Sequence, residues 1–174
     1  MKNFKNNINS LLIVTFLILV LSFTRLLPHP ANFTPIIAAG IFSGFYFRQF
    51  YLSSFIIILS MFLGDLFLGL HNTMFFTYLA LSIIVLVGLS IKNLKITNIL
   101  YSSVASSIIF FVITNFGAWV TLDIYTKNFS GLMQSYIMAI PFFHNTLIST
   151  LFYLLILKIL FDFALKKKVL KFSS

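Results

Sequence analysis

Long apolar runs separated by short polar connections dominate this sequence, and they decide what it can fold into. A helix needs about 20 predominantly apolar residues to cross the hydrocarbon core of a bilayer, with a range of about 17–25. We therefore predict an all-α integral membrane protein, a six-transmembrane-helix bundle that forms a single membrane domain over residues 1–174. The predicted helices are residues 11–27, 35–47, 51–70, 74–91, 97–119 and 141–165. Residues 131–140 are interpreted as a short interfacial helix, because Pro141 suits the first turn of the helix that follows.

The composition excludes the soluble classes of protein. Hydrophobic residues make up 60% of the chain and charged residues only 9%, whereas a soluble domain has about 25% charged residues. The formal net charge of +9 does not indicate nucleic-acid binding, because the basic residues lie in short connections and near the two ends. The absence of cysteine excludes disulfides, thiolate metal sites and cysteine nucleophiles.

The positions of the basic residues predict the orientation of the helices. With the N-terminus in the cytoplasm and six crossings, Arg25 and Lys127 alone fall on the outer side. Cytoplasmic connections carry an excess of Lys and Arg, so we predict a multi-pass protein of the cell inner (plasma) membrane with both termini cytoplasmic. Residues 11–27 are interpreted as a retained helix, because no Ala-x-Ala cleavage site follows them. The other ten basic residues fall inside: Lys2, Lys5, Arg48, Lys92, Lys95, Lys158, Lys166, Lys167, Lys168 and Lys171.

Polar residues that hydrocarbon tolerates poorly gather on the predicted outer side, beginning with a proline-rich connection at residues 25–35. Its prolines should end the first helix near residue 27 and open the next at Pro35. The candidate substrate-binding residues are Arg25, His29, Asn32, Asp65, His71, Asn115, Trp119, His144 and Asn145. We predict one pocket beneath the connection, with these walls: Asp65, Asn115, Trp119, His144 and Asn145.

Asp65 is the most informative of these candidates, because a charge within a spanning helix costs about 2.5–3.5 kcal/mol on insertion scales at mid-bilayer. Two interpretations stay open for it: a structural ion pair with Arg25, or direct contact with a ligand. Trp119 also has two interpretations. It belongs to the aromatic belt of the membrane interface, or it stacks on a flat ligand ring.

The three histidines and Asp65 allow a metal site as an alternative, since imidazole and carboxylate suit zinc, nickel or cobalt. No histidine pair has the one-turn spacing of a preformed helical clamp. We therefore predict no metal and no other cofactor.

Small residues form a stripe on the second predicted helix: Ala38, Ala39, Gly40 and Gly44. Such stripes let helices approach one another closely. Packing within the bundle is the favoured interpretation, and docking to another membrane protein is the alternative.

Four motifs stand out along the chain: Arg25 to Pro35 (RLLPHPANFTP), Gly64-Asp65 with Gly69 and His71, Thr114-Asn115-Phe116-Gly117 with Trp119, and Ala139-Ile-Pro141 with Asn145-Thr. Together they resemble an uncharacterised family of small bacterial membrane proteins. That family is similar to the substrate-binding S-components of energy-coupling factor (ECF) vitamin transporters. The resemblance implies a six-helix bundle that binds a vitamin or related small nutrient from the outer face. A membrane coupling protein and two ATPases would drive the uptake.

One feature departs from the S-component pattern. Residues 11–27 contain no alanine, whereas S-components often carry Ala-x-x-x-Ala on the first helix for docking. Docking through residues 38–44, or function without the coupling module, are the alternatives.

The predicted function is therefore the capture of a small nutrient for uptake, with that nutrient and the lipid bilayer as partners. No enzyme is predicted, because the sequence contains no nucleophile elbow, phosphate loop or zinc-protease motif. One alternative is an importer of metal ions or metal chelates that uses the histidines and Asp65. Another is a membrane protein without a ligand, either an assembly factor or an intramembrane enzyme.

Overall fold

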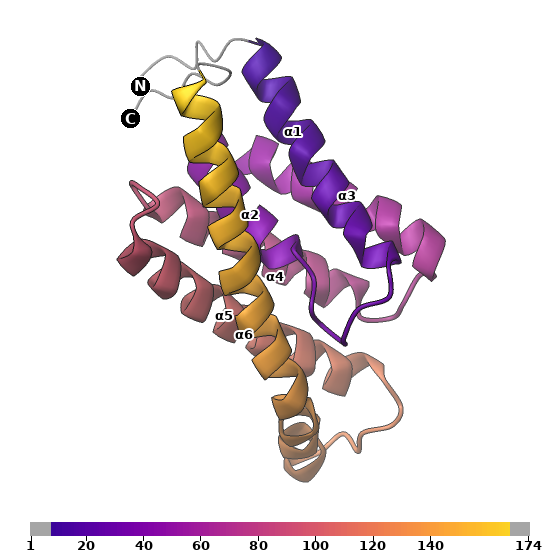
Figure 1. Cartoon of the computed structure of the whole chain (residues 1–174). Coiled ribbons are helices and arrows are strands. Elements are labelled where there is room, and N and C mark those ends of the chain that lie inside the picture. Colours follow the sequence, from indigo (N-terminus) through magenta and orange to yellow (C-terminus); the bar gives the residue numbers. More distant parts are fainter. Residues whose placement is uncertain (1–7, 168–174) are drawn as a thin grey trace.

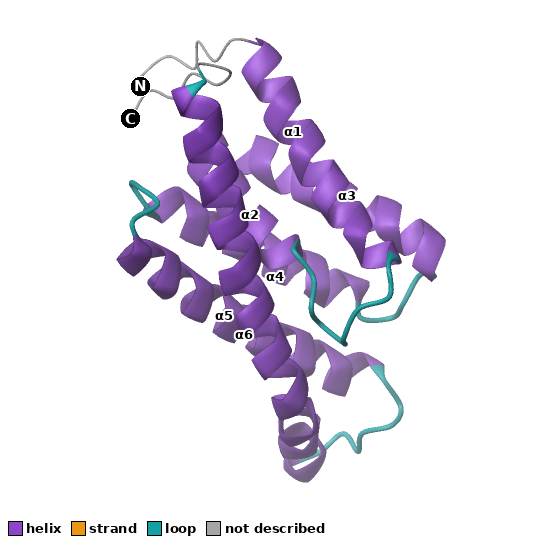
Figure 2. Ribbon diagram, in the orientation of Figure 1, coloured by secondary structure: helices purple, strands orange, loops and turns teal. Residues whose placement is uncertain are grey.

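The computed structural model describes residues 8–167 and consists of helices joined by short connections (Figures 1 and 2). These residues contain no β-strand, so the predicted all-α class is confirmed. Four lysines used to predict the orientation, Lys2, Lys5, Lys168 and Lys171, lie outside the described residues. The helices are α1 (Ile8–Phe23), the 3-10 helix η1 (Thr24–Leu26), α2 (Ile36–Phe47), α3 (Phe50–Leu68), α4 (Met74–Ser90), α5 (Ile96–Thr121) and α6 (Phe129–Lys166).

Three of these helices, α3, α5 and α6, are long and apolar enough to cross a membrane. The other apolar segments are shorter: residues 11–26, α2 and α4. With 12 residues, α2 is about 18 Å long, whereas the hydrocarbon core is about 30 Å thick. The chain is thus an all-helical protein with three candidate membrane-spanning helices, and the shorter helices complete the bundle.

α2 forms the centre of the bundle, because its sequence is apolar on every side. Every residue of Ile36–Phe47 is buried, and the helix packs against α3, α4 and α6. Two glycines allow α2 and α4 to approach closely. A Cβ at Gly44 would lie 2.3 Å from the Val85 carbonyl oxygen, and one at Gly88 would lie 2.1 Å from the Ile41 carbonyl oxygen.

The small-residue stripe of the sequence serves this packing. Ala38, Ala39, Gly40 and Gly44 are all buried, and a Cβ at Gly40 would lie 3.2 Å from Ile84 Cγ2 of α4. The alternative of docking another membrane protein through this stripe does not fit the fold, because these residues present no surface to a partner.

α6 differs most from the prediction. The sequence predicts a separate interfacial helix over residues 131–140 and a last helix that opens at Pro141, but α6 is continuous over Phe129–Lys166 with Pro141 inside it. The helix begins early because Asn128 caps it: Asn128 Oδ1 accepts a hydrogen bond from the Gly131 backbone N–H at 2.9 Å. An internal proline removes one backbone hydrogen bond, which membrane helices tolerate where neighbouring groups satisfy the freed carbonyl.

The connections lie at two opposite ends of the bundle (Figure 2). Residues 24–35, 69–73 and 122–128 lie at one end, called here the Arg25 end, and residues 91–95 lie at the other. Residues 48–49 belong to this second end, called the Arg48 end, because Arg48 is hydrogen-bonded to Leu89 at the end of α4. α1 begins and α6 ends at the Arg48 end (Figure 1). There, Arg48 Nη1 donates a hydrogen bond to the Leu89 carbonyl oxygen at 2.9 Å, which ties the α2–α3 connection to the end of α4.

Candidate functional site

Asp65 stands near the Arg25 end of α3, and its side chain is only 1% exposed. Arg25 Nη2 of η1 donates a hydrogen bond to Asp65 Oδ1 at 3.1 Å, and the Tyr78 hydroxyl of α4 donates to Oδ2 at 2.8 Å. His71 Nε2 lies 3.8 Å from Oδ2 at the more exposed edge of this cluster. Both carboxylate oxygens therefore have partners, and the partners come from two other segments of the chain.

The Arg25 guanidinium lies against α3. Its Nη1 lies 3.4 Å from the Met61 carbonyl oxygen, and a Cβ at Gly64 would lie 3.1 Å from the same nitrogen. A glycine at position 64 thus leaves room for the guanidinium beside the helix. A buried charge is costly unless it is paired and hydrogen-bonded, and Asp65 meets both conditions. The geometry is that of a structural ion pair joining η1, α3 and α4.

Tyr78 is a member of this cluster that the sequence did not reveal. It lies in an apolar run close to a helix start, where a tyrosine looks the same as a member of the interfacial aromatic belt. One signal in the sequence could have pointed to it. A buried carboxylate needs more than one hydrogen-bond donor, and Arg25 was the sole partner proposed for Asp65.

A second group of predicted residues surrounds a small cavity of about 60 Å³ between α5, α6 and the proline-rich connection. Its polar lining consists of Asn32 from the connection, Thr114 and Asn115 from α5, and Thr146 from α6. The apolar lining consists of Phe110, Phe111, Ala139, Phe142 and Phe143. Apolar walls with a few convergent polar groups are the usual composition of a small-molecule site.

Three of the four polar side chains of this cavity are accommodated by their own helices. Thr114 Oγ1, Asn115 Nδ2 and Thr146 Oγ1 each donate to the carbonyl oxygen four residues earlier, at 2.7, 2.8 and 2.9 Å. Such bonds satisfy the donors of polar side chains within an apolar helix. The hydroxyl and amide oxygens of these three residues keep acceptor capacity, so they offer hydrogen-bond acceptors, and the Asn32 amide adds both a donor and an acceptor.

The proline-rich connection is held to α6 beside this cavity. Asn145 Nδ2 donates a hydrogen bond to the Ala31 carbonyl oxygen at 2.9 Å, and Ser149 Oγ lies 3.4 Å from the Asn32 carbonyl oxygen. Asn145 therefore acts on the connection and does not line the cavity. Asn32 has a φ of 61°, in the left-handed region that asparagine tolerates better than most residues.

Phe33 adds an apolar attachment to the same connection. Its ring centroid lies 6.2 Å from that of Phe152 and 5.9 Å from that of Tyr153, both on α6. At its two ends the connection is fixed by Arg25, bound to Asp65, and by the buried Pro35 at the start of α2. The segment is thus a cover with a small number of attachments.

The remaining candidates lie elsewhere. Trp119 Nε1 donates to the Thr126 carbonyl oxygen at 2.9 Å and so fastens the α5–α6 connection. His144 Nδ1 lies 3.2 Å from the Ile140 carbonyl oxygen of its own helix, and the ring nitrogens of His29 lie beside carbonyl oxygens of its own connection. Within residues 8–167, no three His, Asp or Glu side chains group as metal ligands would.

The predicted single pocket therefore does not describe the structure. Asp65 belongs to the ion-pair cluster with Arg25 and His71, whereas Asn115 lines the cavity and Asn145 holds its cover. The sequence places these residues at one end of the bundle. Which interface each side chain enters depends on how its helix is rotated about its own axis.

Residues 5–172 match a family of unknown function (DUF6580), and the chain belongs to this family. The match spans both the ion-pair cluster and the cavity, and the family description names no ligand or activity. No curated protein and no solved structure matches the chain.

Proposed function

We propose that this protein is a substrate-binding membrane subunit, similar to the S-components of ECF vitamin transporters, that captures a small nutrient at the Arg25 end of the bundle. The observation that carries the proposal is the cavity between α5 and α6, where polar side chains interrupt aromatic walls. Its cover is fastened to α6 through the hydrogen bond of Asn145 and the ring contacts of Phe33. Capture of this kind requires no catalytic group.

The chemistry of the lining indicates the class of nutrient. Thr114, Asn115 and Thr146 offer oxygen acceptors, so a ligand with N–H or O–H donors is favoured. Phe111 and Phe143 meet edge to face, with ring centroids 5.2 Å apart, and supply apolar surface for a flat ring. No charged side chain lines this cavity. A neutral molecule with a heterocyclic ring, such as a vitamin or a vitamin precursor, fits these features.

The size of the cavity requires that its cover moves. About 60 Å³ is room for roughly two water molecules, whereas small-molecule sites measure about 300–1,000 Å³. The nutrient enters when the proline-rich connection separates from α6. The hydrogen bond from Asn145, at about 0.5–1.5 kcal/mol, opposes this separation, and the aromatic contacts of Phe33 add about 0.5–1.5 kcal/mol per pair. A cost of a few kcal/mol leaves roughly 0.1–10% of the molecules open.

The six-span topology with both termini in the cytoplasm is part of the proposal. Arg48, Lys92 and Lys95 occupy the connections at the Arg48 end, and α6 ends there at Lys166. The excess of Lys and Arg in cytoplasmic connections puts this end inside the cell, so the cavity faces outward. α2 is shorter than a typical membrane-spanning helix. It is buried on all sides, so its surroundings are other helices of the bundle and not lipid.

Energy for uptake would come from partners, the coupling protein and ATPases that the S-component resemblance implies. Because the α2 stripe is buried, such a coupling protein would contact other helices. The metal-importer alternative gains no support from the described residues, since no three of their His, Asp or Glu side chains group as metal ligands would.

Mass spectrometry of small molecules that copurify with the detergent-solubilised protein tests the proposal. The molecule found is then titrated calorimetrically into wild-type protein and variants. Asn115→Ala should weaken binding about tenfold, the equivalent of about 1.4 kcal/mol, because it removes a polar group of the cavity. Asn98→Ala, on the same helix but at the Arg48 end, is the matched control and should bind like wild type.

Asn145→Ala tests the cover. Loss of its hydrogen bond to the Ala31 carbonyl oxygen should raise both the association and the dissociation rate constants, because the connection then separates more often. The proposal fails if no small molecule copurifies. It also fails if Asn115→Ala and Asn98→Ala bind the molecule equally well.

A further inference from the structure

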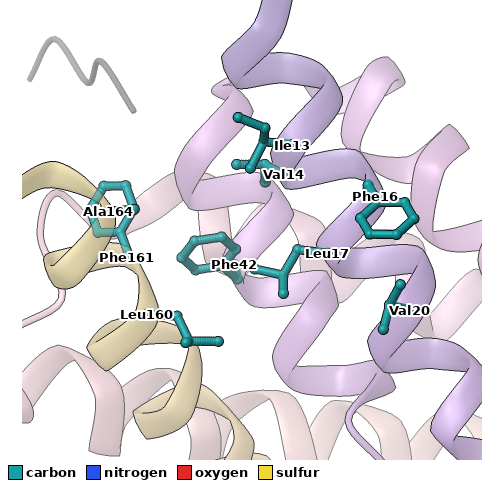
Figure 3. Close-up of a pocket in the computed structure, with 9 residues that line it drawn as sticks. All are labelled: Ile13, Val14, Phe16, Leu17, Val20, Phe42, Leu160, Phe161 and Ala164. Carbon is teal, nitrogen blue, oxygen red and sulfur yellow. The ribbon is translucent and has the colours of Figure 1, made fainter. Parts of the chain in front are cut away.

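A second cavity, independent of the proposed nutrient site, lies between α1 and α6 over the face of α2. It measures about 260 Å³, and Figure 3 shows Phe42 of α2 between Leu17 of α1 and Phe161 of α6. Every side chain that lines it is apolar: Ile13, Val14, Phe16, Leu17, Val20, Phe42, Leu160, Phe161 and Ala164. The structure therefore contains an apolar groove, called here the α1–α6 groove.

The groove opens sideways from the bundle. Its floor is buried, with Val14 and Phe42 each 1% exposed. Its rims are open, with Phe16 69%, Val20 45% and Leu160 42% exposed. Since the outer surface of a membrane bundle faces hydrocarbon, the open rims face lipid. The occupant therefore enters from the bilayer.

The dimensions of the groove select the kind of occupant. From Ile13 to Val20 the groove extends about 10 Å along α1, at a rise of about 1.5 Å per residue. A partner helix that spans the hydrocarbon core needs a contact surface along about 30 Å. The groove is thus too short to hold the spanning helix of a partner protein and suits part of a single hydrocarbon chain.

The face of α6 that lines the groove continues to a basic residue. Leu160, Ala164 and Lys167 follow one another at intervals of four and three residues, so they share one face of α6. Lys167 is exposed at the end of α6, beside the equally exposed Lys166. The nearest acid along α6, Asp162, is already bound to Lys158. Lys167 Nζ stands over the Phe163 ring, 5.8 Å from its centroid, so α6 carries a positive charge about one helical turn beyond the groove lining.

We propose that the α1–α6 groove binds one acyl chain of an anionic phospholipid, whose phosphate group pairs with Lys167. An apolar chain gains little by leaving one hydrocarbon environment for another, so the chain alone confers little selectivity. Selectivity comes from the headgroup, because lysines at the membrane surface attract anionic lipids. The bound lipid fills the gap between α1 and α6 and belongs to the leaflet at the Arg48 end.

Native mass spectrometry of the whole protein, released from nanodiscs with equal amounts of phosphatidylglycerol and phosphatidylcholine, tests this proposal. Wild-type protein should retain phosphatidylglycerol over phosphatidylcholine by about fivefold, the effect of one lysine on attraction to an anionic surface. Lys167→Gln should abolish this preference. Lys95→Gln, an exposed lysine of the α4–α5 connection, is the matched control and should keep it.

A second pair of variants tests the groove itself. Ala164→Phe adds bulk inside the groove and should eliminate the retained lipid, whereas Ile159→Phe adds bulk to an exposed position of α6 outside it and should not. If Ala164→Phe does not fold, Ile13→Trp fills the groove from the rim of α1. Retention of both lipids in equal amounts, or retention unchanged in the groove-filling variant, would overturn the proposal. So would a copurifying membrane protein that is lost from the Ala164→Phe variant.

Discussion

The replacement of Asp65 by asparagine tests whether the ion-pair cluster holds the fold together. Asparagine keeps the shape of the side chain and can still accept from the Tyr78 hydroxyl, but it leaves Arg25 without a countercharge. The Arg25 side chain is only 13% exposed. The removal of one partner of a buried ion pair costs about 3–5 kcal/mol, because the other charge stays buried and uncompensated. Since Arg25 retains some contact with water, the lower value, about 3 kcal/mol, is expected.

A double variant separates this cause from a general effect of substitution. In Arg25→Met with Asp65→Asn both charges are absent, so no buried cation remains. The double variant should therefore be more stable than Asp65→Asn alone, even though it carries one substitution more. The exposed Asp123 provides the matched control, and Asp123→Asn should unfold like wild type.

Unfolding of the detergent-solubilised proteins, followed by circular dichroism during a denaturant titration, measures these differences. A midpoint for Asp65→Asn equal to those of wild type and Asp123→Asn would refute the structural interpretation. If this variant also bound the copurified nutrient poorly, the alternative of direct ligand contact would replace it. A double variant less stable than Asp65→Asn would show that the uncompensated Arg25 charge is not the cause.

Two further predictions concern helix packing and orientation. Gly44→Ala should lower the free energy of unfolding by about 1–3 kcal/mol, because its Cβ would lie 2.3 Å from the Val85 carbonyl oxygen, whereas Gly40→Ala meets a side-chain methyl at 3.2 Å and should cost less. The same titration ranks the two variants, and equal midpoints would contradict the close packing of α2 on α4. Cysteines introduced at Lys127 and Asn93 should react with a membrane-impermeant maleimide from opposite sides, Lys127 from outside intact cells. Reaction of both from the outside would eliminate the proposed topology.

The sequence alone was sufficient for the class of fold and for most helix positions. Apolar runs in a chain with 9% charged residues leave little choice but helices, because hydrocarbon demands that backbone groups bond within their own segment. The pairing of Asp65 with Arg25 was also accessible as one of two interpretations, since a buried carboxylate needs a cation and Arg25 is the nearest basic residue at the same end.

The start of α6 was not predicted correctly from the sequence. Pro141 looked like a helix opening, and the residues before it looked like a separate segment. Proline is allowed at the first helical position and is also tolerated inside a packed membrane helix, so it does not by itself mark a boundary. The informative signal was Asn128, three residues before Gly131, which caps the helix.

The lateral arrangement of the helices was decided by the tertiary structure. Hydropathy along the chain indicates how far along its helix each residue lies, and it predicted Asp65, Asn115 and Asn145 at one end of the bundle. Hydropathy does not indicate how each helix is rotated about its own axis, because a helix that contacts lipid with one face and protein with the other is apolar on both faces. The separation of Asp65 from the Asn115 cavity, the burial of α2 on every side, and the groove between α1 and α6 all follow from which faces pack together. Steric fit between helices determines that choice: the close contact at Gly44 and Gly88 brings α2 and α4 together, and sequence periodicity carries no signal of it.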